Sequence, residues 1–297
     1  MPQQFDIVII GNYTKDTIIS ASGTRQVDGG GFNYGAHVAR MMGLSTAAVT
    51  RLAAADRHVV EALERIGVTV FPVYTPHSTL MTLRYPTADV DQRVLTVSHT
   101  AGSFTTDQVE GLDARLFLLN GSMRGEISPG VLAVLRAKGA LVAADVQAFV
   151  RVLNPDGTLT CQPWPEMERV LSQFDILKTD AVEAETLTGS TDIRSASRIL
   201  VGLGPKEIVL THRDGVLAFD GNSFYEAPFR LKKLVGRSGR GDTCIASYAA
   251  RRLSGSPEQA LIWAAAVTSL KLEAEGPIRR TAAEVEQLIE REYSGRP

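Results

Sequence analysis

The sequence predicts an α/β protein in which a mostly parallel sheet is covered by helices on both faces. Short β-branched runs alternate with stretches of helical period along most of the chain. The 297 residues, 44% hydrophobic and 22% charged, are typical of a globular domain large enough to bury a core without disulfides. Two β-prone pieces interrupt the alternation. We therefore expect a single domain over residues 1–297, with lid segments inserted at about 14–30 and 74–100.

The first half of the chain opens with a β-branched run at 5–10 that ends at Gly11, as in a buried strand. A helix is predicted at 33–42, because Gly43 occupies the place of a C-terminal glycine cap. A strand, a helix and a strand follow at 46–50, 57–65 and 68–73. Around the turn-rich sequence PTADVDQ, apolar residues alternate with period two. This pattern predicts a hairpin within 78–100.

After Gly102 the regular alternation returns. Strands are predicted at 116–119, 140–146, 175–178 and 207–210, and helices at 129–138, 165–172, 181–187 and 193–203. A second hairpin, with strands at 216–219 and 223–227, turns at Asp220-Gly221. Three helices close the chain, at 242–253, 257–272 and 282–290. This order predicts parallel strands with crossover helices.

Composition excludes several classes of protein. Lys and Arg number 31 against 33 Asp and Glu, so the chain lacks the basic balance of a nucleic-acid binder. Two cysteines cannot form a disulfide framework. The longest apolar stretch, 261–270, is too short to span a bilayer, and the first residues lack the basic segment of a signal peptide. We expect a cytoplasmic enzyme without nucleic-acid or membrane partners.

The most informative motif is the glycine-rich run from Gly236 to Asp242, which precedes a predicted helix. A glycine turn at a helix N-terminus offers N–H groups to an anion. The run matches a phosphate-binding P-loop except that Asp242 stands where the lysine belongs. A carboxylate at this place is suited to take a proton from a hydroxyl nucleophile. The alternative is that Asp242 only caps the helix.

This run resembles the second signature of the ribokinase family, the PfkB-type carbohydrate kinases, which reads D-S/T-x-G-A-G-D. Gly239, Gly241 and Asp242 match it, and Arg240 takes the alanine position. The resemblance implies a ribokinase-like fold, with Asp242 as the base and the backbone amides of Gly239, Arg240 and Gly241 as an anion hole. Potassium-activated members have an Asp at the place of Gly236. The resemblance therefore does not imply that this chain depends on a monovalent cation.

Two N-terminal segments resemble the acceptor site of that family. Residues 28–43 are similar to its first signature, with Gly29, Gly30 and Asn33 in a loop that contacts substrate hydroxyls. The segment from Asn12 to Asp16 follows the first strand, and Asp16 matches an Asp that accepts hydrogen bonds from a sugar. A turn leading into a helix, with a solvated loop carboxylate, is the alternative.

Two later segments resemble the donor site. Residues 178–189 are similar to the N-x-x-E segment of the family, with Glu183 at the Glu and Asp180 at the Asn. The resemblance implies that Asp180 and Glu183 hold Mg²⁺ through water, and that Lys178 and Asp180 border the ATP. The family also has a strand and turn that pack on the nucleotide. Of that motif, this sequence retains Thr211 and Gly215. An acidic, capped first turn of a helix is the alternative for Asp180 and Glu183.

The end of the strand at 140–146 adds Asp145, Gln147 and Arg151, a pattern similar to the inositol-kinase-like branch of the family. The resemblance implies an ATP-dependent kinase that phosphorylates a sugar or polyol. A nucleoside kinase is an alternative, because Phe32, Tyr34 and Phe149 can form an aromatic wall. A non-catalytic relative that binds nucleotide or sugar is another. The resemblance also implies a possible homodimer through the lid.

Arg84 and Arg93 are interpreted as solvated residues of the predicted hairpin rather than as groups that meet a phosphorylated sugar.

Overall fold

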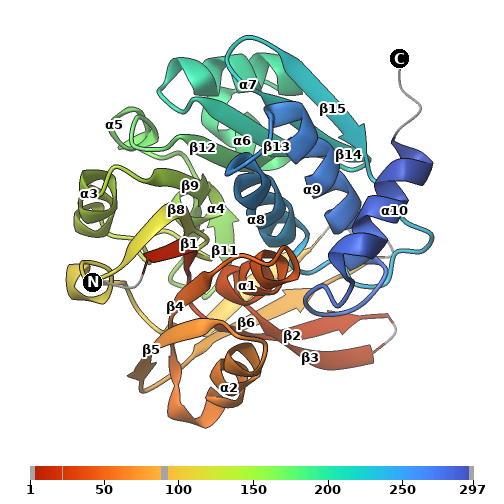
Figure 1. The fold of residues 1–297 in the computed structure, drawn as a ribbon. Helices are drawn as coiled ribbons and strands as arrows, with labels where there is room; N and C mark the ends of the chain where they lie inside the picture. Colours follow the sequence, from red (N-terminus) through yellow and green to blue (C-terminus); the bar gives the residue numbers. More distant parts are fainter. Residues whose placement is uncertain (1–3, 22, 88–92, 294–297) are drawn as a thin grey trace.

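The computed structural model describes residues 4–21, 23–87 and 93–293 of the chain. Its centre is a nine-stranded sheet (Figure 1), in the order β15-β14-β13-β12-β9-β8-β1-β4-β5. The strands are β1 (Gln4–Ile10), β4 (Thr46–Ala53), β5 (Thr69–Thr75), β8 (Asp113–Leu119), β9 (Leu141–Asp145), β12 (Ile176–Asp180), β13 (Glu207–Thr211), β14 (Gly215–Phe219) and β15 (Phe224–Pro228). All neighbours pair in parallel except β13-β14 and β14-β15. The predicted fold class is confirmed.

Helices cover both faces of this sheet. One face carries α1 (Gly31–Met41), α2 (His58–Arg65), α8 (Arg240–Arg252), α9 (Pro257–Leu272) and α10 (Ala282–Glu292). The other carries α3 (Pro129–Ala137), α4 (Gln147–Val150), α5 (Met167–Leu171), α6 (Ala181–Thr188) and α7 (Ile193–Gly202). In the part of the chain that the structure describes, no helix is both long and apolar enough to cross a bilayer.

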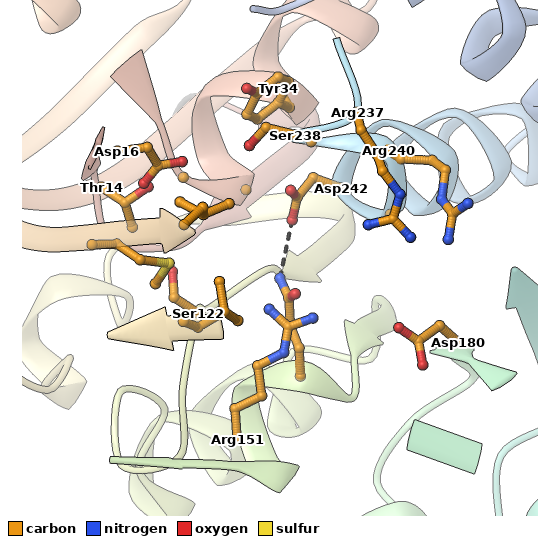
Figure 2. Close-up of a pocket in the computed structure, with 18 of the residues that line it drawn as sticks. Thr14, Asp16, Tyr34, Ser122, Arg151, Asp180, Arg237, Ser238, Arg240 and Asp242 are labelled. Carbon is orange, nitrogen blue, oxygen red and sulfur yellow. Dashed lines mark hydrogen bonds between the residues drawn. The ribbon is translucent and has the colours of Figure 1, made fainter. Parts of the chain in front are cut away.

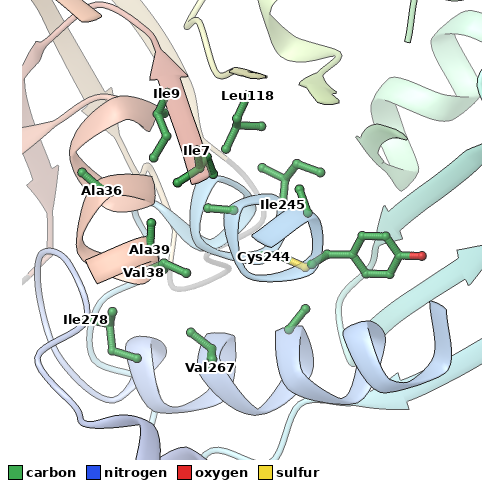
Figure 3. Packing of buried hydrophobic residues seen from close by; sticks show 14 of the residues in the cluster. Ile7, Ile9, Ala36, Val38, Ala39, Leu118, Cys244, Ile245, Val267 and Ile278 are labelled. Atoms are coloured by element: carbon green, nitrogen blue, oxygen red, sulfur yellow. The ribbon is translucent and has the colours of Figure 1, made fainter. Parts of the chain in front are cut away.

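The central strands supply two hydrophobic cores because successive side chains point to opposite faces. In β1, Ile7 and Ile9 join the core beneath α1 and α8, whereas Val8 and Ile10 join the core beneath α3. Figure 3 shows the first of these cores, with Ile7 and Ile9 beside α1, and Val267 of α9 lying across from them. Burial on both faces explains why the strand sequences are continuously apolar.

The lid is a separate four-stranded sheet in the order β3-β2-β6-β7. Its strands are β2 (Thr14–Ser20), β3 (Gly23–Gly29), β6 (Thr79–Arg84) and β7 (Val94–His99). The predicted hairpin is confirmed, since β6 and β7 pair antiparallel. The lid has its own small core, which contains Ile18, Met81, Leu83 and Val97.

Two pairs of strands differ from the sequence prediction. Residues of β3 are mostly polar and were predicted only as part of the lid segment at about 14–30, without a strand of their own; they pair antiparallel along the whole of β2. A hairpin of β10 (Arg151–Leu153) and β11 (Leu159–Cys161) was not predicted. The strand β3 and the hairpin β10-β11 depend on pairing with a neighbouring strand, because their sequences have no period-two apolar pattern.

Candidate active site

A pocket of about 740 Å³ lies where the carboxyl ends of the central strands meet the lid (Figure 2). Ligands of open α/β sheets bind at this edge. Strand ends supply Ser122, Gln147, Lys178, Asp180 and Thr211. The other lining residues come from the N-terminal loops, the lid and the glycine-rich loop, and are Thr14, Asp16, Gly30, Gly31, Tyr34, Met81, Leu83, Arg93, Leu95, Arg151, Arg237, Ser238, Gly239, Arg240, Gly241 and Asp242.

Asp242 lies in the first turn of α8 and points into the middle of the pocket (Figure 2). Its Oδ1 accepts a hydrogen bond of 3.1 Å from Nε2 of Gln147. The N–H groups of Gly241 and Asp242 belong to the first turn, where a helix has no internal acceptor for them. A carboxylate and an anion-binding helix end therefore meet at one point.

Two glycines bring this loop close to its neighbours. Gly239 has φ of +78°, a left-handed conformation that favours glycine, and a Cβ here would lie 2.2 Å from the ring of Tyr34. A Cβ on Gly241 would lie 2.6 Å from Nζ of Lys178. Position 239 is therefore restricted to glycine by its backbone conformation and close packing, whereas a side chain at position 241 would displace the ammonium of Lys178.

Asp16 lies on β2 and is buried, with 5% of its surface exposed. Burial, together with the charge of Asp242, raises the pKa of Asp16 to about 7, against the lowering effects of Thr14 and Arg93. Within the described residues, Oδ1 of Asp16 has no hydrogen-bond partner. An unpaired buried acceptor that faces Asp242 across a pocket is suited to bind an alcohol hydroxyl.

The opposite end of the pocket is rich in cations, namely Arg93, Arg151, Lys178, Arg237 and Arg240. Figure 2 shows Arg237 and Arg240 together on this side, with Asp180 below them. Lys178 contacts Oδ2 of Asp145 at 3.0 Å. Burial lowers the pKa of Lys178, but the carboxylates of Asp145, Glu183 and Asp180 together raise it above the ordinary value. Lys178 therefore carries its charge at neutral pH.

Most of the predicted site residues line this pocket. They are Asp16, Gly30, Gln147, Arg151, Lys178, Asp180, Thr211, Gly239, Arg240, Gly241 and Asp242. They come from segments far apart in the sequence, and the fold brings them to one sheet edge.

The remaining predicted residues lie behind the pocket wall. Asn12 donates to the carbonyl of Gly102 at 2.9 Å, and Asn33 donates to the carbonyl of Asp28 at 3.0 Å. Gly29 permits close approach, since a Cβ there would lie 2.5 Å from Oδ2 of Asp16. Gly215 packs against β15, where a Cβ would lie 2.4 Å from the carbonyl oxygen of Ala227. These residues shape the loops around the site rather than its surface.

The two predicted metal residues have different surroundings. Oε1 of Glu183 accepts from Arg151 at 2.9 Å, and its Oε2 accepts from the backbone of Asp180 at 2.9 Å. Both carboxylate oxygens of Glu183 are thus engaged, one with the guanidinium of Arg151 and the other in the capping of α6. Asp180 faces the pocket, although its Oδ1 accepts from the backbone of Glu183. Among the described residues, no three His, Cys, Asp or Glu gather as a metal cluster. A Mg²⁺ that keeps most of its water fits Asp180 alone.

Sequence reasoning missed several lining residues, and one interpretation was wrong. Arg93 is not a solvated hairpin residue, because it lines the pocket next to Leu95, whereas Arg84 is exposed. The position of Arg93 depends on how the lid packs against the sheet, and no local sequence pattern indicates that packing. Arg237 and Ser238 lie within the glycine-rich run and Ser122 follows β8, but none of the three had a signal of its own.

Two of the three residues proposed for an aromatic wall do not line the pocket. Phe32 is fully buried in the core, and Phe149 stacks on Trp164 with ring centroids 4.7 Å apart. Tyr34 is the member of the three that lines the pocket.

A carboxylate beside the N-terminus of a helix, below a small β lid, is an arrangement suited to phosphoryl transfer to an alcohol. Residues 6–283 match the family model of the pfkB family carbohydrate kinases, so the chain belongs to this family. The chain is therefore a carbohydrate kinase with the ribokinase-like fold.

Several relatives are similar over nearly the whole chain. A pyrophosphate-dependent kinase of the ribokinase family, solved with sulfate, is 36% identical with a TM-score of 0.88, covering 94% of this chain and 99% of that one. A complex of such a kinase with a pyrophosphate analogue and myo-inositol is 35% identical with a TM-score of 0.87, covering 95% and 99%. The curated cytidine kinase of Thermococcus kodakarensis is 28% identical over 265 residues, 85% of this chain and 90% of its own.

Proposed function

We propose that this carbohydrate kinase transfers a phosphoryl group from pyrophosphate to a hydroxyl of a cyclic polyol such as myo-inositol. The cluster of five cations at one end of the pocket is the observation that carries the proposal. Pyrophosphate presents a high charge density without a base or ribose to bind, and arginines suit its oxygens because they donate in pairs. The sequence predicted ATP as the donor; we propose pyrophosphate in its place.

The acceptor end supports a polyol. Asp16, Thr14, Ser122 and Gln147 offer short polar groups at several angles around the pocket. Met81, Leu83 and Leu95 of the lid add an apolar ceiling. A ring with hydroxyls at its edge and C–H groups on its face fits such a mixture. Two of the similar structures are described as myo-inositol complexes or kinases, which agrees with this acceptor class.

The reaction then follows from the position of Asp242. Its carboxylate accepts the proton of the attacking hydroxyl while the new O–P bond forms. The bond between the transferred phosphoryl group and the leaving phosphate breaks, and the leaving oxygen takes the electron pair. The amides at the start of α8 stabilise charge on the transferred group, and Arg237 and Arg240 stabilise the leaving phosphate. Asp180 would hold Mg²⁺ through water, and the ion would supply further neutralisation of the donor charge.

ATP is a second candidate for the donor because of one observation. An adjoining pocket that shares Arg237 and Arg240 has the apolar walls Phe229, Leu231 and Leu272, against which a base can pack. A nucleoside acceptor is less supported, since the pocket offers one aromatic side chain, Tyr34, among those predicted.

A matrix of donors and acceptors tests the proposal. The purified protein is incubated with pyrophosphate or ATP, together with myo-inositol, ribose or cytidine, and the phosphorylated product is measured by mass spectrometry. We expect the highest kcat/KM for pyrophosphate with myo-inositol, and turnover reduced ~10²–10⁴-fold in Asp242→Asn. A preference for ATP would contradict the donor assignment, and a preference for cytidine would contradict the acceptor assignment.

A further inference from the structure

Lys271 is a buried cation directly beneath the glycine-rich loop. It lies in the last turn of α9, and 1% of its surface is exposed. Its ammonium donates to the carbonyl oxygen of Gly236 at 2.6 Å and also to the carbonyl oxygen of Ser238. The ring of Tyr34 lies 5.4 Å from Nζ. The reaction described above does not use this residue.

A lysine at the end of a helix ordinarily extends into water, where its charge is solvated. Lys271 does not, although burying an ammonium among neutral groups is costly. Burial lowers the pKa of Lys271 to about 8, against the raising effects of Glu275 and Asp242. In the described part of the chain, the hydrogen bonds of Lys271 go to carbonyl oxygens rather than to carboxylates. Lys271 therefore binds the backbone of the glycine-rich loop rather than a carboxylate partner.

The contacts of Lys271 set the direction of the loop peptides. In a trans peptide, the carbonyl and the following N–H point in opposite directions. Since the Ser238 carbonyl points to Lys271, the N–H of Gly239 points away from it. The start of the loop is also bound to α9, because Val235 and Gly236 both donate to the carbonyl of Leu272. The ammonium thus fixes the peptides that precede the anion hole.

The neighbouring position leaves no room for the side chain that other family members use. A Cβ on Gly236 would lie 2.2 Å from the carbonyl oxygen of Ala274 and 2.8 Å from its carbonyl carbon. An Asp at this place, which helps to hold the cation in potassium-activated relatives, would displace this backbone. The residues present therefore do not fit a bound potassium ion. The loop carbonyls of Gly236 and Ser238 are bound by the ammonium of Lys271 instead.

We propose that the ammonium of Lys271 is a built-in monovalent cation that positions the anion-hole loop, so that phosphoryl transfer requires no potassium or other monovalent metal ion. Lys271 is a positioning residue, because it acts through the loop and does not touch the substrate pocket. This inference rests on the proposed function in one respect: the loop must bind the phosphoryl group that is transferred.

The first test uses the unmodified protein. Its turnover is measured in chlorides of potassium, sodium and tetramethylammonium at equal ionic strength. We expect the same rate in all three, because the required charge is part of the chain. A rate that needs potassium would overturn the proposal, whatever the outcome of mutagenesis.

The second test removes the ammonium. For Lys271→Met we expect turnover to fall about 10²-fold, as when one donor is lost from an oxyanion hole, with the KM of the acceptor unchanged. In Lys271→Ala, added ammonium or potassium ions should restore part of the rate. The matched control is Lys138→Met, which removes another lysine near a helix end that donates to a backbone carbonyl, at 2.7 Å from Glu110 and far from the site. It should retain full turnover.

Two results would contradict the role of Lys271. One is full turnover in a folded Lys271→Met protein, and the other is a loss in folded Lys271→Ala that neither ammonium nor potassium repairs. Calorimetric titration with pyrophosphate gives a readout without turnover, and we expect weaker binding in Lys271→Met than in Lys138→Met. If another donor or acceptor proves to be correct, all variants are compared on that pair. Failure of the proposed function therefore remains distinct from failure of this inference.

Discussion

The two ends of the pocket differ in their charge, and Asp242 lies between them. The acceptor end combines Asp16 with short neutral groups and the apolar lid residues Met81 and Leu83. The donor end gathers Arg151, Lys178, Arg237 and Arg240, together with Arg93 of the lid. Hydroxyls are bound by short acceptors and donors, whereas phosphates require cations. The difference indicates which end holds the alcohol and in which direction the phosphoryl group moves.

The ends also differ in how their charges are balanced. Asp16 has an unpaired oxygen and a raised pKa, because burial and the charge of Asp242 outweigh the lowering effects of Thr14 and Arg93. At the donor end, Lys178 pairs with Asp145 and Arg151 pairs with Glu183. The donor end is therefore preorganised by internal ion pairs, whereas the acceptor end leaves its carboxylate for the substrate.

The largest expected effect lies at the boundary between the two ends. Asp242→Asn keeps the size of the side chain but removes the base, so we expect turnover to fall ~10²–10⁴-fold. Pyrophosphate binding, measured by calorimetry, should persist because the cations are intact. The exposed residue Asp107 gives the control Asp107→Asn, which should have no effect. Turnover near normal in Asp242→Asn would remove the basis for dividing the pocket at this residue.

Next in size is the effect of closing the anion hole. Gly239→Ala places a methyl group against Tyr34 in a backbone conformation that alanine rarely adopts. We expect turnover to fall by about 10²-fold, comparable to the loss of an oxyanion-hole donor. Gly202→Ala, where a Cβ meets open space at the end of α7, is the control and should leave turnover unchanged without lowering Tm. Equal behaviour of the two variants would argue against a role for the loop geometry.

The donor end can be weakened separately from the acceptor end. Arg237→Gln and Arg240→Gln each remove one charged donor, and we expect the KM for pyrophosphate to rise roughly 10-fold or more. The KM for the polyol should stay constant, because neither guanidinium belongs to the acceptor end. Arg291→Gln on α10 serves as the control. If these substitutions raise the KM of the acceptor instead, the two ends are assigned in reverse.

The smallest effect concerns pH and the acceptor end alone. Asp16 has a pKa of about 7 in the free protein, so it loses its negative charge as the pH falls below this value. We expect kcat/KM for the acceptor at pH 6 to be about tenfold below its plateau, with pyrophosphate affinity less affected. A flat profile between pH 6 and 8 would show that the charge of Asp16 does not matter for the acceptor.

The same carboxylate has an effect of opposite sign on stability. The pKa of Asp16 is higher in the folded protein than its unfolded value of 3.8, so its contribution to stability is lost as the pH rises through about 7. Asp16→Asn should therefore raise Tm at pH 8, relative to the unmodified protein, while it lowers acceptor binding. At pH 4 the gain in Tm should largely disappear.

Much of the fold could be predicted because its signals are local. The helix at 257–272 was predicted with its observed bounds, since Ser256 and Pro257 begin it with a capping box and a favoured N-terminal proline. The strand β3 was predicted only as part of a lid segment, because its residues are polar and its structure depends on pairing with β2. Its existence is a property of two segments rather than of one.

The sequence by itself determined the alternating architecture, the carboxylate Asp242 proposed as the base and the two glycines beside it. Each of these depends on local period, backbone conformation or side-chain chemistry within a few residues. Only the tertiary structure decided that Arg93 faces the pocket and that Lys271 supports Gly236, 35 positions earlier in the chain. Such contacts arise from the packing of the lid and of α9 against the site, and no short stretch of sequence contains that information.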